Sequence, residues 1–224
     1  MRGRWSVDPY FVAGLIAVLA AGALFLFKNT SAAGVRIPPS EIEPIIAALD
    51  SLGLAHQYGP SGDRIQVVEL FDFECPACAA AHLATWPSIQ EFVAAGLISF
   101  TAYDMPLPTH RYAVPAALVM SCVEEVDSVR AWDVRHAVFK SQSDWVQAYP
   151  VEAALLAIAA DLQVDTVDAR RCIRETGGQR TQDLKGALDV ARRHGLTGIP
   201  LWIVNGQVVR WSKLEESILE IGER

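Results

Sequence analysis

Cysteines and basic residues are both scarce in this sequence. Four cysteines in 224 residues are too few for a small scaffold built from many disulfides. The 19 basic residues are outnumbered by 26 acidic ones, for a net charge of −7, which argues against nucleic-acid binding. Charged residues make up only 20% and apolar residues 51%, which excludes a disordered polymer. The length then indicates one compact domain, or one domain with an appendage.

The sequence also lacks recognisable cofactor patterns. It contains no glycine-rich phosphate loop and no dinucleotide-binding fingerprint. It contains no internal repeat and no low-complexity tract. We therefore expect no bound cofactor.

A long uncharged run lies near the N-terminus, at residues 10–27. Its 18 residues would rise roughly 27 Å as a helix, about the thickness of a bilayer's hydrocarbon core. Arg2 and Arg4 precede the run, which favours a cytoplasmic N-terminus. We predict a transmembrane anchor in the cytoplasmic membrane, with residues 1–9 in the cytoplasm and the rest on the periplasmic side. Small residues at 31–33 leave a cleaved signal peptide open, and both interpretations export the bulk of the chain.

Residues 28–63 are expected to form a linker and one short helix. The linker is small, polar and ends in two prolines. Ser40 and Glu43 match a capping box that would begin the helix, and Gly53 would end it.

The remaining chain alternates between strand and helix patterns. Residues 65–71 and 97–103 are short apolar runs that predict strands. Asn205-Gly206 lies between two further apolar runs and predicts a hairpin. The order of elements predicts a mixed α/β sheet interrupted by helices. The sheet domain would comprise residues 64–105 and 182–224.

Residues 106–181 carry apolar residues at spacings of three and four, which predicts a helical insertion. Its last helix would cover residues 167–175, with Asp165 near the capped start. A separate helix would follow at residues 182–194. Ser212 would cap a final helix near the C-terminus.

The motif Cys75-Pro76-Ala77-Cys78 directly follows the first strand and begins a helix. Pro76 suits the first helical turn, where its missing N–H is no loss. Cys75 then lies at the helix N-terminus, where free N–H groups favour a thiolate. Cys78, one turn later, can attack a mixed disulfide formed at Cys75. We predict Cys75 as the nucleophile and Cys78 as the resolving thiol.

Two other interpretations of the motif remain open. It could be half of a zinc site, with His82 nearby, but no second pair of ligands follows at the usual spacing, and we expect no metal. It could also be a structural disulfide, although so short a loop constrains the unfolded chain little.

The segment from Glu69 to Cys78 resembles the active-site segment of the DsbA-like thiol–disulfide oxidoreductases of the thioredoxin superfamily. That family places an acid six residues before the first cysteine, where this chain has Glu69. Residues 198–201 (GIPL) are similar to the family's cis-proline loop, and residues 106–181 are similar to its helical domain. The resemblance covers about residues 64–224. It implies a thioredoxin-like fold with a helical insertion domain, preceded here by the N-terminal transmembrane helix.

The resemblance also implies roles for individual residues. Pro200 would follow a cis peptide bond, and the backbone of Ile199 would pair with an extended substrate. Pro76 and Ala77 would complete the substrate-binding surface. Glu69, buried and with a raised pKa, would take the Cys78 proton. A trans proline and a surface carboxylate are the alternatives for the loop and for Glu69.

The chain departs from DsbA between its cysteines. Ala77 stands where DsbA has a histidine that stabilises the thiolate, and Glu74 adds a negative charge next to Cys75. We therefore expect a less stabilised thiolate than in DsbA.

Cys122 and Cys172 lie in predicted helices of the insertion. In an oxidising compartment an even number of cysteines favours a structural disulfide between them. The alternative is two buried free thiols.

These features predict an extracytoplasmic thiol–disulfide oxidoreductase that acts on the thiols of exported proteins, as an oxidant. A membrane oxidase, DsbB-like or VKOR-like, would then restore its disulfide. One alternative is a reductase or isomerase supplied by a transmembrane reductant carrier. Another is a non-catalytic tethered peptide-binding module with a structural disulfide.

Overall fold

The structure is a computed structural model that describes residues 37–196 and 198–223. The predicted cytoplasmic segment and anchor, residues 1–27, lie outside these ranges. Within the described ranges, no helix combines the length and the apolar character that crossing a membrane requires.

A mixed sheet forms the centre of the described fold. Within the described residues it has five strands in the order β1-β3-β2-β4-β5. β2 and β3 are parallel, and the other neighbouring pairs are antiparallel. The strands are β1 (Ala55–Tyr58), β2 (Ile65–Phe71), β3 (Ile98–Asp104), β4 (Leu201–Val204) and β5 (Gln207–Val209).

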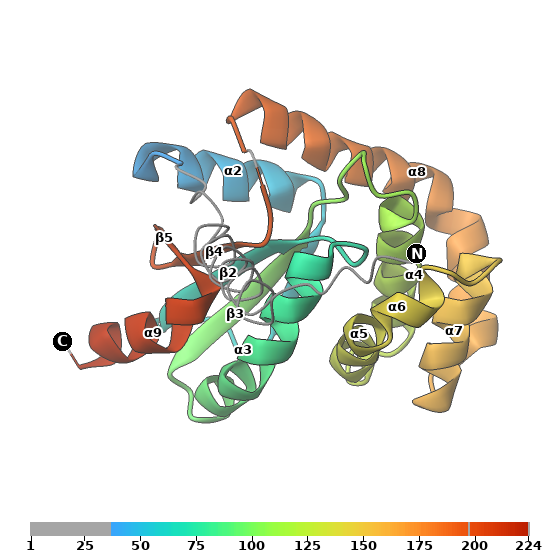
Figure 1. The fold of residues 1–224 in the computed structure, drawn as a ribbon, viewed down its shortest axis with the longest axis horizontal. Coiled ribbons are helices and arrows are strands. Elements are labelled where there is room, and N and C mark those ends of the chain that lie inside the picture. Colours follow the sequence, from blue (N-terminus) through green and yellow to red (C-terminus); the bar gives the residue numbers. More distant parts are fainter. Residues whose placement is uncertain (1–36, 197, 224) are drawn as a thin grey trace, which may run out of the picture. The chain divides into compact units, whose positions relative to one another are not determined.

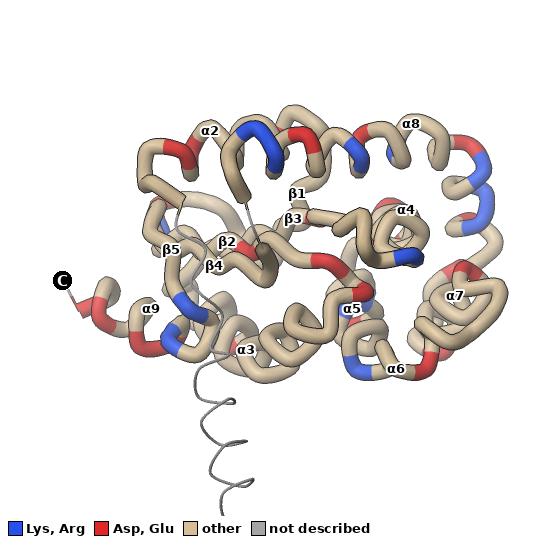
Figure 2. The backbone as a smooth tube through the Cα atoms, turned by 45° about the horizontal axis from the view of Figure 1, so that its top comes forward, with Lys and Arg blue, Asp and Glu red and all other residues tan. Residues whose placement is uncertain are grey.

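Helices cover both faces of this sheet (Figure 1). α3 (Pro76–Ala94) and α9 (Leu214–Gly222) lie on one face, and α2 (Pro39–Ser51) lies on the other. Figure 2 shows the same layers from a second angle, with α2 and α8 side by side. The central strands are therefore buried on both faces, which is why β2 and β3 consist mainly of apolar residues.

A group of helices stands beside the sheet, between β3 and β4 in the chain. It includes four shorter helices and the first part of a long one. These are α4 (Ala113–Val126), α5 (Ala131–Lys140), α6 (Gln142–Trp145), α7 (Val151–Asp161) and α8 (Thr166–Arg193).

The prediction of two separate helices at residues 167–175 and 182–194 is wrong, because α8 is continuous over 28 residues. Gly177 is buried in its middle. A Cβ atom on Gly177 would lie 3.4 Å from the Leu118 side chain of α4. The close packing of the two helices compensates for the low helix propensity of glycine, about 1 kcal/mol per residue.

Of the helix caps predicted from the sequence, the structure confirms the one at Asp165. Asp165 caps α8, accepting hydrogen bonds from Val167 N at 2.8 Å and Asp168 N at 3.2 Å. The capping predicted for Ser40 and Ser212 is wrong. α2 begins with proline at its first position, which needs no side-chain cap, and Ser212 lies in a short 3-10 turn before α9.

The hairpin between β4 and β5 is confirmed. Asn205 and Gly206 both adopt left-handed backbone conformations, with φ of 45° and 76°, as a two-residue type I′ turn requires. Asn205 also joins the hairpin to β2, because its side chain accepts a hydrogen bond from Gln66 N at 2.8 Å.

Candidate active site

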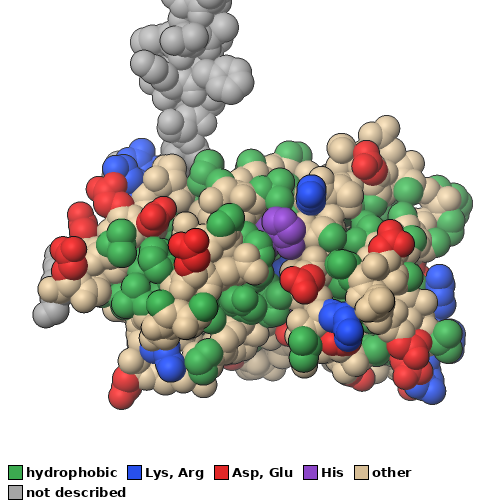
Figure 3. All heavy atoms as spheres, turned by 90° about the horizontal axis from the view of Figure 1, so that it is seen from below, with side chains coloured by type: hydrophobic (Ala, Val, Ile, Leu, Met, Phe, Trp, Pro, Cys, Tyr) green, Lys and Arg blue, Asp and Glu red, His purple; other side chains and the backbone are tan. Residues whose placement is uncertain are grey.

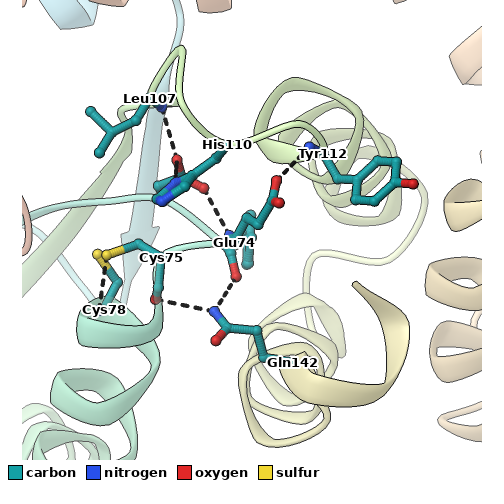
Figure 4. Close-up of polar contacts among 9 residues, drawn as sticks. Glu74, Cys75, Cys78, Leu107, His110, Tyr112 and Gln142 are labelled. Carbon is teal, nitrogen blue, oxygen red and sulfur yellow. Dashed lines mark hydrogen bonds and ion pairs between the residues drawn. The ribbon is translucent and has the colours of Figure 1, made fainter. Parts of the chain in front are cut away.

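Cys75 and Cys78 lie where β2 ends and α3 begins (Figure 4). Cys75 is the N-cap of α3, and Pro76 occupies its first turn. The Cys75 sulfur accepts a hydrogen bond from Cys78 N at 3.4 Å. Both thiols are free, and Cys75 retains 6% exposure while Cys78 has none. Pro76 and Ala77 between them are exposed, so an incoming thiol would meet Cys75 first.

The environment separates the acidities of the two thiols. A hydrogen bond from the Cys78 thiol, helped by the backbone N–H groups of Cys78 and Ala77, lowers the pKa of Cys75 to about 6 against the opposing effect of burial. Burial, followed by that same hydrogen bond, raises the pKa of Cys78 well above its usual value. The site can therefore hold a thiolate at Cys75 and a thiol at Cys78 at neutral pH.

Glu69 lies on β2 and is 1% exposed, so it is not a surface carboxylate. Burial raises its pKa to about 8, although nearby Arg135 acts in the opposite direction. The charge of Glu69 in turn raises the pKa of Cys78. The two groups are thus close enough to affect each other's protonation.

The loop before β4 contains a cis peptide bond between Ile199 and Pro200. Both residues are partly exposed. The next residue, Leu201, pairs with Leu70 of β2, and β2 leads directly to the cysteines. This pairing places the loop beside the end of β2 from which the active-site segment continues.

The negative charge that acts on Cys75 comes from Asp72 and not from the predicted Glu74. Glu74 turns away from the sulfur, and its carboxylate accepts a hydrogen bond from Tyr112 N (Figure 4). Asp72 is the acid that raises the pKa of Cys75. Its buried carboxylate accepts hydrogen bonds from Leu107 N at 2.8 Å and His110 Nδ1 at 2.7 Å.

Gln142 of α6 is a further residue of the site, and the sequence does not predict it. Its Nε2 donates to the carbonyl oxygens of Phe73 at 2.7 Å and Cys75 at 3.1 Å (Figure 4). The helical region thereby holds the backbone on which the nucleophile stands. No local pattern marks this glutamine, since 67 residues separate it from Cys75.

Cys122 and Cys172 form a disulfide with a Cα–Cα distance of 5.7 Å. It joins α4 to α8 across a sequence separation of 50 residues, within the helical region.

His82, the residue considered as a partner in a zinc site, lies inside the protein. Its ring is stacked on Trp86 and Phe139, at centroid distances of 5.2 and 4.6 Å. Burial lowers its pKa to about 3. Across residues 37–196 and 198–223, no three histidine, cysteine or acidic side chains gather as a metal site would require.

On the face that carries α3 and α9, hydrophobic side chains alternate with scattered charges (Figure 3). A surface pocket of about 260 Å³ lies between these two helices, lined by Thr85, Ile89 and Leu214 among others. Its lining does not include the cysteines.

Comparison with known proteins gives one family match and one curated relative. The family model described as thioredoxin matches residues 55–221. The chain is 27% identical over 158 residues to the Na⁺/H⁺ antiporter NhaA 3 of Salinispora tropica. That match covers 68% of this chain but only 22% of the antiporter, so the chain spans about a fifth of the relative's length.

Several solved structures are similar to the described fold. The thiol-disulfide exchange protein alpha-DsbA2 of Wolbachia pipientis has a TM-score of 0.66 at 18% identity, covering 82% of this chain and 95% of that one. Oxidised BdbD of Bacillus subtilis has a TM-score of 0.61 at 22% identity, covering 75% and 93%. The thiol-disulfide oxidoreductase MdbA of Actinomyces oris has a TM-score of 0.62 at 18% identity, covering 75% and 83%.

Proposed function

This chain belongs to the thioredoxin family, with a thioredoxin-like α/β fold and a helical insertion, and from that premise we propose that it is a thiol–disulfide oxidoreductase. The observation that carries the proposal is the pair of free thiols whose pKa values are shifted in opposite directions. Solved structures of similar fold include proteins described as thiol–disulfide oxidoreductases, which supports oxidoreductase chemistry in general. The antiporter match covers too little of that protein to support a transport activity.

The proposed reaction begins with the Cys75–Cys78 disulfide and a substrate dithiol. A substrate thiolate attacks the Cys75 sulfur, the Cys75–Cys78 bond breaks, and a substrate–Cys75 disulfide forms. Cys78 leaves as a thiolate and receives a proton from Glu69, which is neutral below its pKa of about 8 and later regains its proton from solvent. The second substrate thiolate then attacks the substrate sulfur of the mixed disulfide, and Cys75 leaves as a thiolate.

Electrons and protons balance over these steps. The substrate loses two electrons and two protons and gains a disulfide. The cysteine pair gains the two electrons. One proton ends on Cys78 by way of Glu69, and the other remains in solvent.

We propose that the protein works as an oxidant outside the cytoplasm, on the thiols of exported proteins. A low pKa makes Cys75 a good leaving group, which favours passing the disulfide on to a substrate. The Cys122–Cys172 disulfide fits a compartment in which disulfides persist. We propose residues 10–27 as the membrane anchor and a DsbB-like or VKOR-like membrane oxidase as the partner that restores the Cys75–Cys78 disulfide. Ile199, Pro200, Pro76 and Ala77 would contact the substrate.

The first test is the pH dependence of alkylation of the reduced protein by iodoacetamide. We expect Cys75 to react with a midpoint near its pKa of about 6, while Cys78 stays unmodified because its thiol is buried and weakly acidic. The Cys75→Ser variant is the control and should leave almost no reaction at neutral pH. A midpoint near the ordinary thiol value of about 8.5 would contradict the assignment.

The second test is capture of mixed disulfides in cells by a Cys78→Ala variant, which cannot release a substrate from Cys75. We expect exported proteins and one integral membrane protein, recovered with the membrane fraction. The Cys75→Ala/Cys78→Ala double variant is the control. Recovery of the control set alone would refute thiol exchange, as expected for a peptide-binding module. A cysteine pair found reduced in wild-type cells would instead favour the reductase or isomerase alternative.

A further inference from the structure

A second group of ionisable side chains is buried on the sheet face that carries α3 and α5. We call it the ion cluster and define it as His56 of β1, Asp104 of β3, Glu124 of α4 and Arg135 of α5. Its members occupy four separate elements, and His56, Asp104 and Arg135 are each 4% exposed or less. None of them takes part in the thiol exchange described above.

Within the ion cluster, each contact joins a basic side chain to a carboxylate. His56 Nε2 lies 2.7 Å from Asp104 Oδ2, and its Nδ1 is hydrogen-bonded to the Glu124 carboxylate. Arg135 approaches Glu124 at 3.9 Å. The Arg135 guanidinium also lies over the rings of Trp132 and Phe71, at 4.7 and 4.9 Å from the ring centroids. Cation–π contacts with these two rings thus help to hold the guanidinium in place.

Glu69 shares the sheet face with this cluster. In the register of the sheet, His56 pairs with Ala102, and Ala102 pairs with Glu69, so the three side chains lie in one row. Asp104 follows two residues after Ala102 and points to the same face. Among the described residues, Glu69 Oε1 and Arg135 Nη1 are both buried without a hydrogen-bond partner. Because the charges of Glu69 and Arg135 affect each other's pKa, the two side chains lie near each other, yet these two atoms have no hydrogen-bond partner.

The charges within the ion cluster explain why Glu69 and Arg135 form no ion pair. The ion cluster contains two carboxylates, Asp104 and Glu124, and two groups that can carry positive charge, His56 and Arg135. Each positive group already has a carboxylate partner. A third negative charge at Glu69 would have no counter-charge in a region from which water is excluded, and such a charge is costly.

We propose that the ion cluster keeps Glu69 protonated by matching Arg135 and His56 with carboxylates other than Glu69. The inference rests on the proposed function, in which a neutral Glu69 gives a proton to the Cys78 thiolate. His56 and Glu124 would then be positioning residues, which act on the reaction through the protonation of Glu69 and touch neither sulfur nor substrate.

The directions of the individual shifts agree with this arrangement. Burial and Arg135 lower the pKa of His56, but Asp104 and Glu124 outweigh them and raise it overall. Burial raises the pKa of Glu124, but His56, Arg135 and, last in order, Arg180 outweigh it and lower the pKa overall. Charges on Arg135 of α5 and Cys78 of α3 interact directly with Glu69. His56 of β1, Asp104 of β3 and the uncharged Trp202 of β4 lie on the same sheet face, and Glu124 of α4 acts through its contacts with His56 and Arg135.

The test is a direct titration of the Glu69 side-chain carboxyl by carbon-13 NMR. The oxidised full-length protein is used so that neither active-site thiol titrates, and Glu69→Gln assigns the signal. In wild type we expect a midpoint near 8. Glu124→Gln keeps the side chain's shape and an acceptor for His56 but removes one negative charge, so Arg135 becomes available to Glu69. We expect the midpoint to fall by about one pH unit or more, a tenfold change in proton affinity.

Two further variants separate electrostatics from structural damage. His56→Gln removes a positive charge from the same cluster and should shift the midpoint upwards, opposite to Glu124→Gln. Glu125→Gln is the matched control, since Glu125 neighbours Glu124 on α4 but is exposed and pairs with Arg180. It should leave the midpoint unchanged. General loosening of the core would move both cluster variants in the same direction.

The outcomes are distinguishable from those for the proposed function, because titration of the oxidised protein does not require thiol exchange. Shifts of opposite sign with an unchanged control support the inference even if the chain exchanges no disulfides. Equal midpoints in wild type, Glu124→Gln and His56→Gln overturn it even if exchange is fast. If His56→Gln does not fold, Glu124→Gln against the Glu125→Gln control decides the matter, and a Glu69 midpoint in Glu124→Gln that does not fall below that of the control overturns the inference.

Discussion

Two cysteines three positions apart differ in acidity because only one of them lies at the end of a helix. Cys75 accepts the N–H of Cys78 and faces the unpaired N–H groups of the first turn. Cys78 lies one turn further in, without exposure, and its negative charge would have little solvation. Because α3 begins at Pro76, Cys75 lies at the helix end and Cys78 lies inside the first turn. The place where the helix begins therefore sets the difference in acidity between the two thiols.

Replacing Glu69 by glutamine tests the buried acid without reference to any substrate. The folded chain retains the Glu69 proton up to about pH 8, whereas the unfolded chain releases it near 4.5. The protonated form's contribution to stability is therefore fully present below pH 4.5 and is lost as the pH rises towards 8. Glu69→Gln removes this loss, so its stability relative to wild type should increase by on the order of 3 kcal/mol between pH 4.5 and pH 7.

Urea unfolding of both oxidised proteins at several pH values measures this difference, since other titrating groups cancel between them. Asp133→Asn, an exposed acid on α5, serves as the control and should follow wild type. A Glu69→Gln curve parallel to that of wild type across this pH range would mean that Glu69 is already ionised in the folded protein.

At the scale of elements, a single glutamine connects α6 to the start of α3. Gln142→Leu keeps a side chain of similar size but removes the donor that serves two carbonyl oxygens. The Cys75 oxygen still accepts from Ala79 N at 3.0 Å, so the Phe73 oxygen is the acceptor that loses its donor. A buried acceptor left without a donor costs about 1–3 kcal/mol, and we expect a comparable loss of stability. The Cys75 backbone should become less fixed, and the alkylation midpoint of Cys75 should move upwards from about 6.

Gln147→Leu is the matched control for this prediction. Gln147 is exposed, and its side chain donates to Ser143 O, four residues earlier. It should change neither the stability nor the alkylation midpoint appreciably. If Gln142→Leu lowers stability but leaves the midpoint of Cys75 unchanged, Gln142 only supports the fold.

The elements differ in how far sequence could predict them. β2, α3 and the β4–β5 hairpin depend on local chemistry and were predicted closely, apart from the ends of β5. β1 was missed because AHQY has no apolar alternation, and its pairing with β3 supplies the reason for a strand. The continuity of α8 depends on the contact between Gly177 and Leu118 of another helix.

In the candidate site, too, local motifs predict some residues, whereas others depend on tertiary packing. The cysteines, Glu69 and the Ile199-Pro200 loop carry local motifs, so a resemblance could point to them. The direction of the Glu74 side chain and the reach of Gln142 depend on tertiary packing. The ion cluster is assembled from four elements between β1 and α5, and no spacing along the chain indicates it.

At the scale of the whole molecule, the described fold consists of a sheet domain and a helical region that meet at the cysteines and at α8. The helical region supplies Gln142 to the active site, and α8 extends from it to lie beside α2 on the sheet domain. The Cys122–Cys172 disulfide fixes α4 to the first part of α8, so it joins two helices of the same region and closes a loop that contains α5, α6 and α7.

Removing this disulfide should therefore reduce stability and spare the chemistry. A loop of 50 residues corresponds to roughly 4 kcal/mol of chain entropy in the unfolded state. We expect the Cys122→Ser/Cys172→Ser variant to lose stability of that order in urea unfolding, with the alkylation midpoint of Cys75 unchanged. The Cys75→Ser/Cys78→Ser variant is the comparison, because its short loop contributes roughly half as much chain entropy, about 2 kcal/mol. Since Cys122 and Cys172 contact neither thiol of the active site, loss of disulfide exchange without loss of stability would show that they take part in the redox cycle.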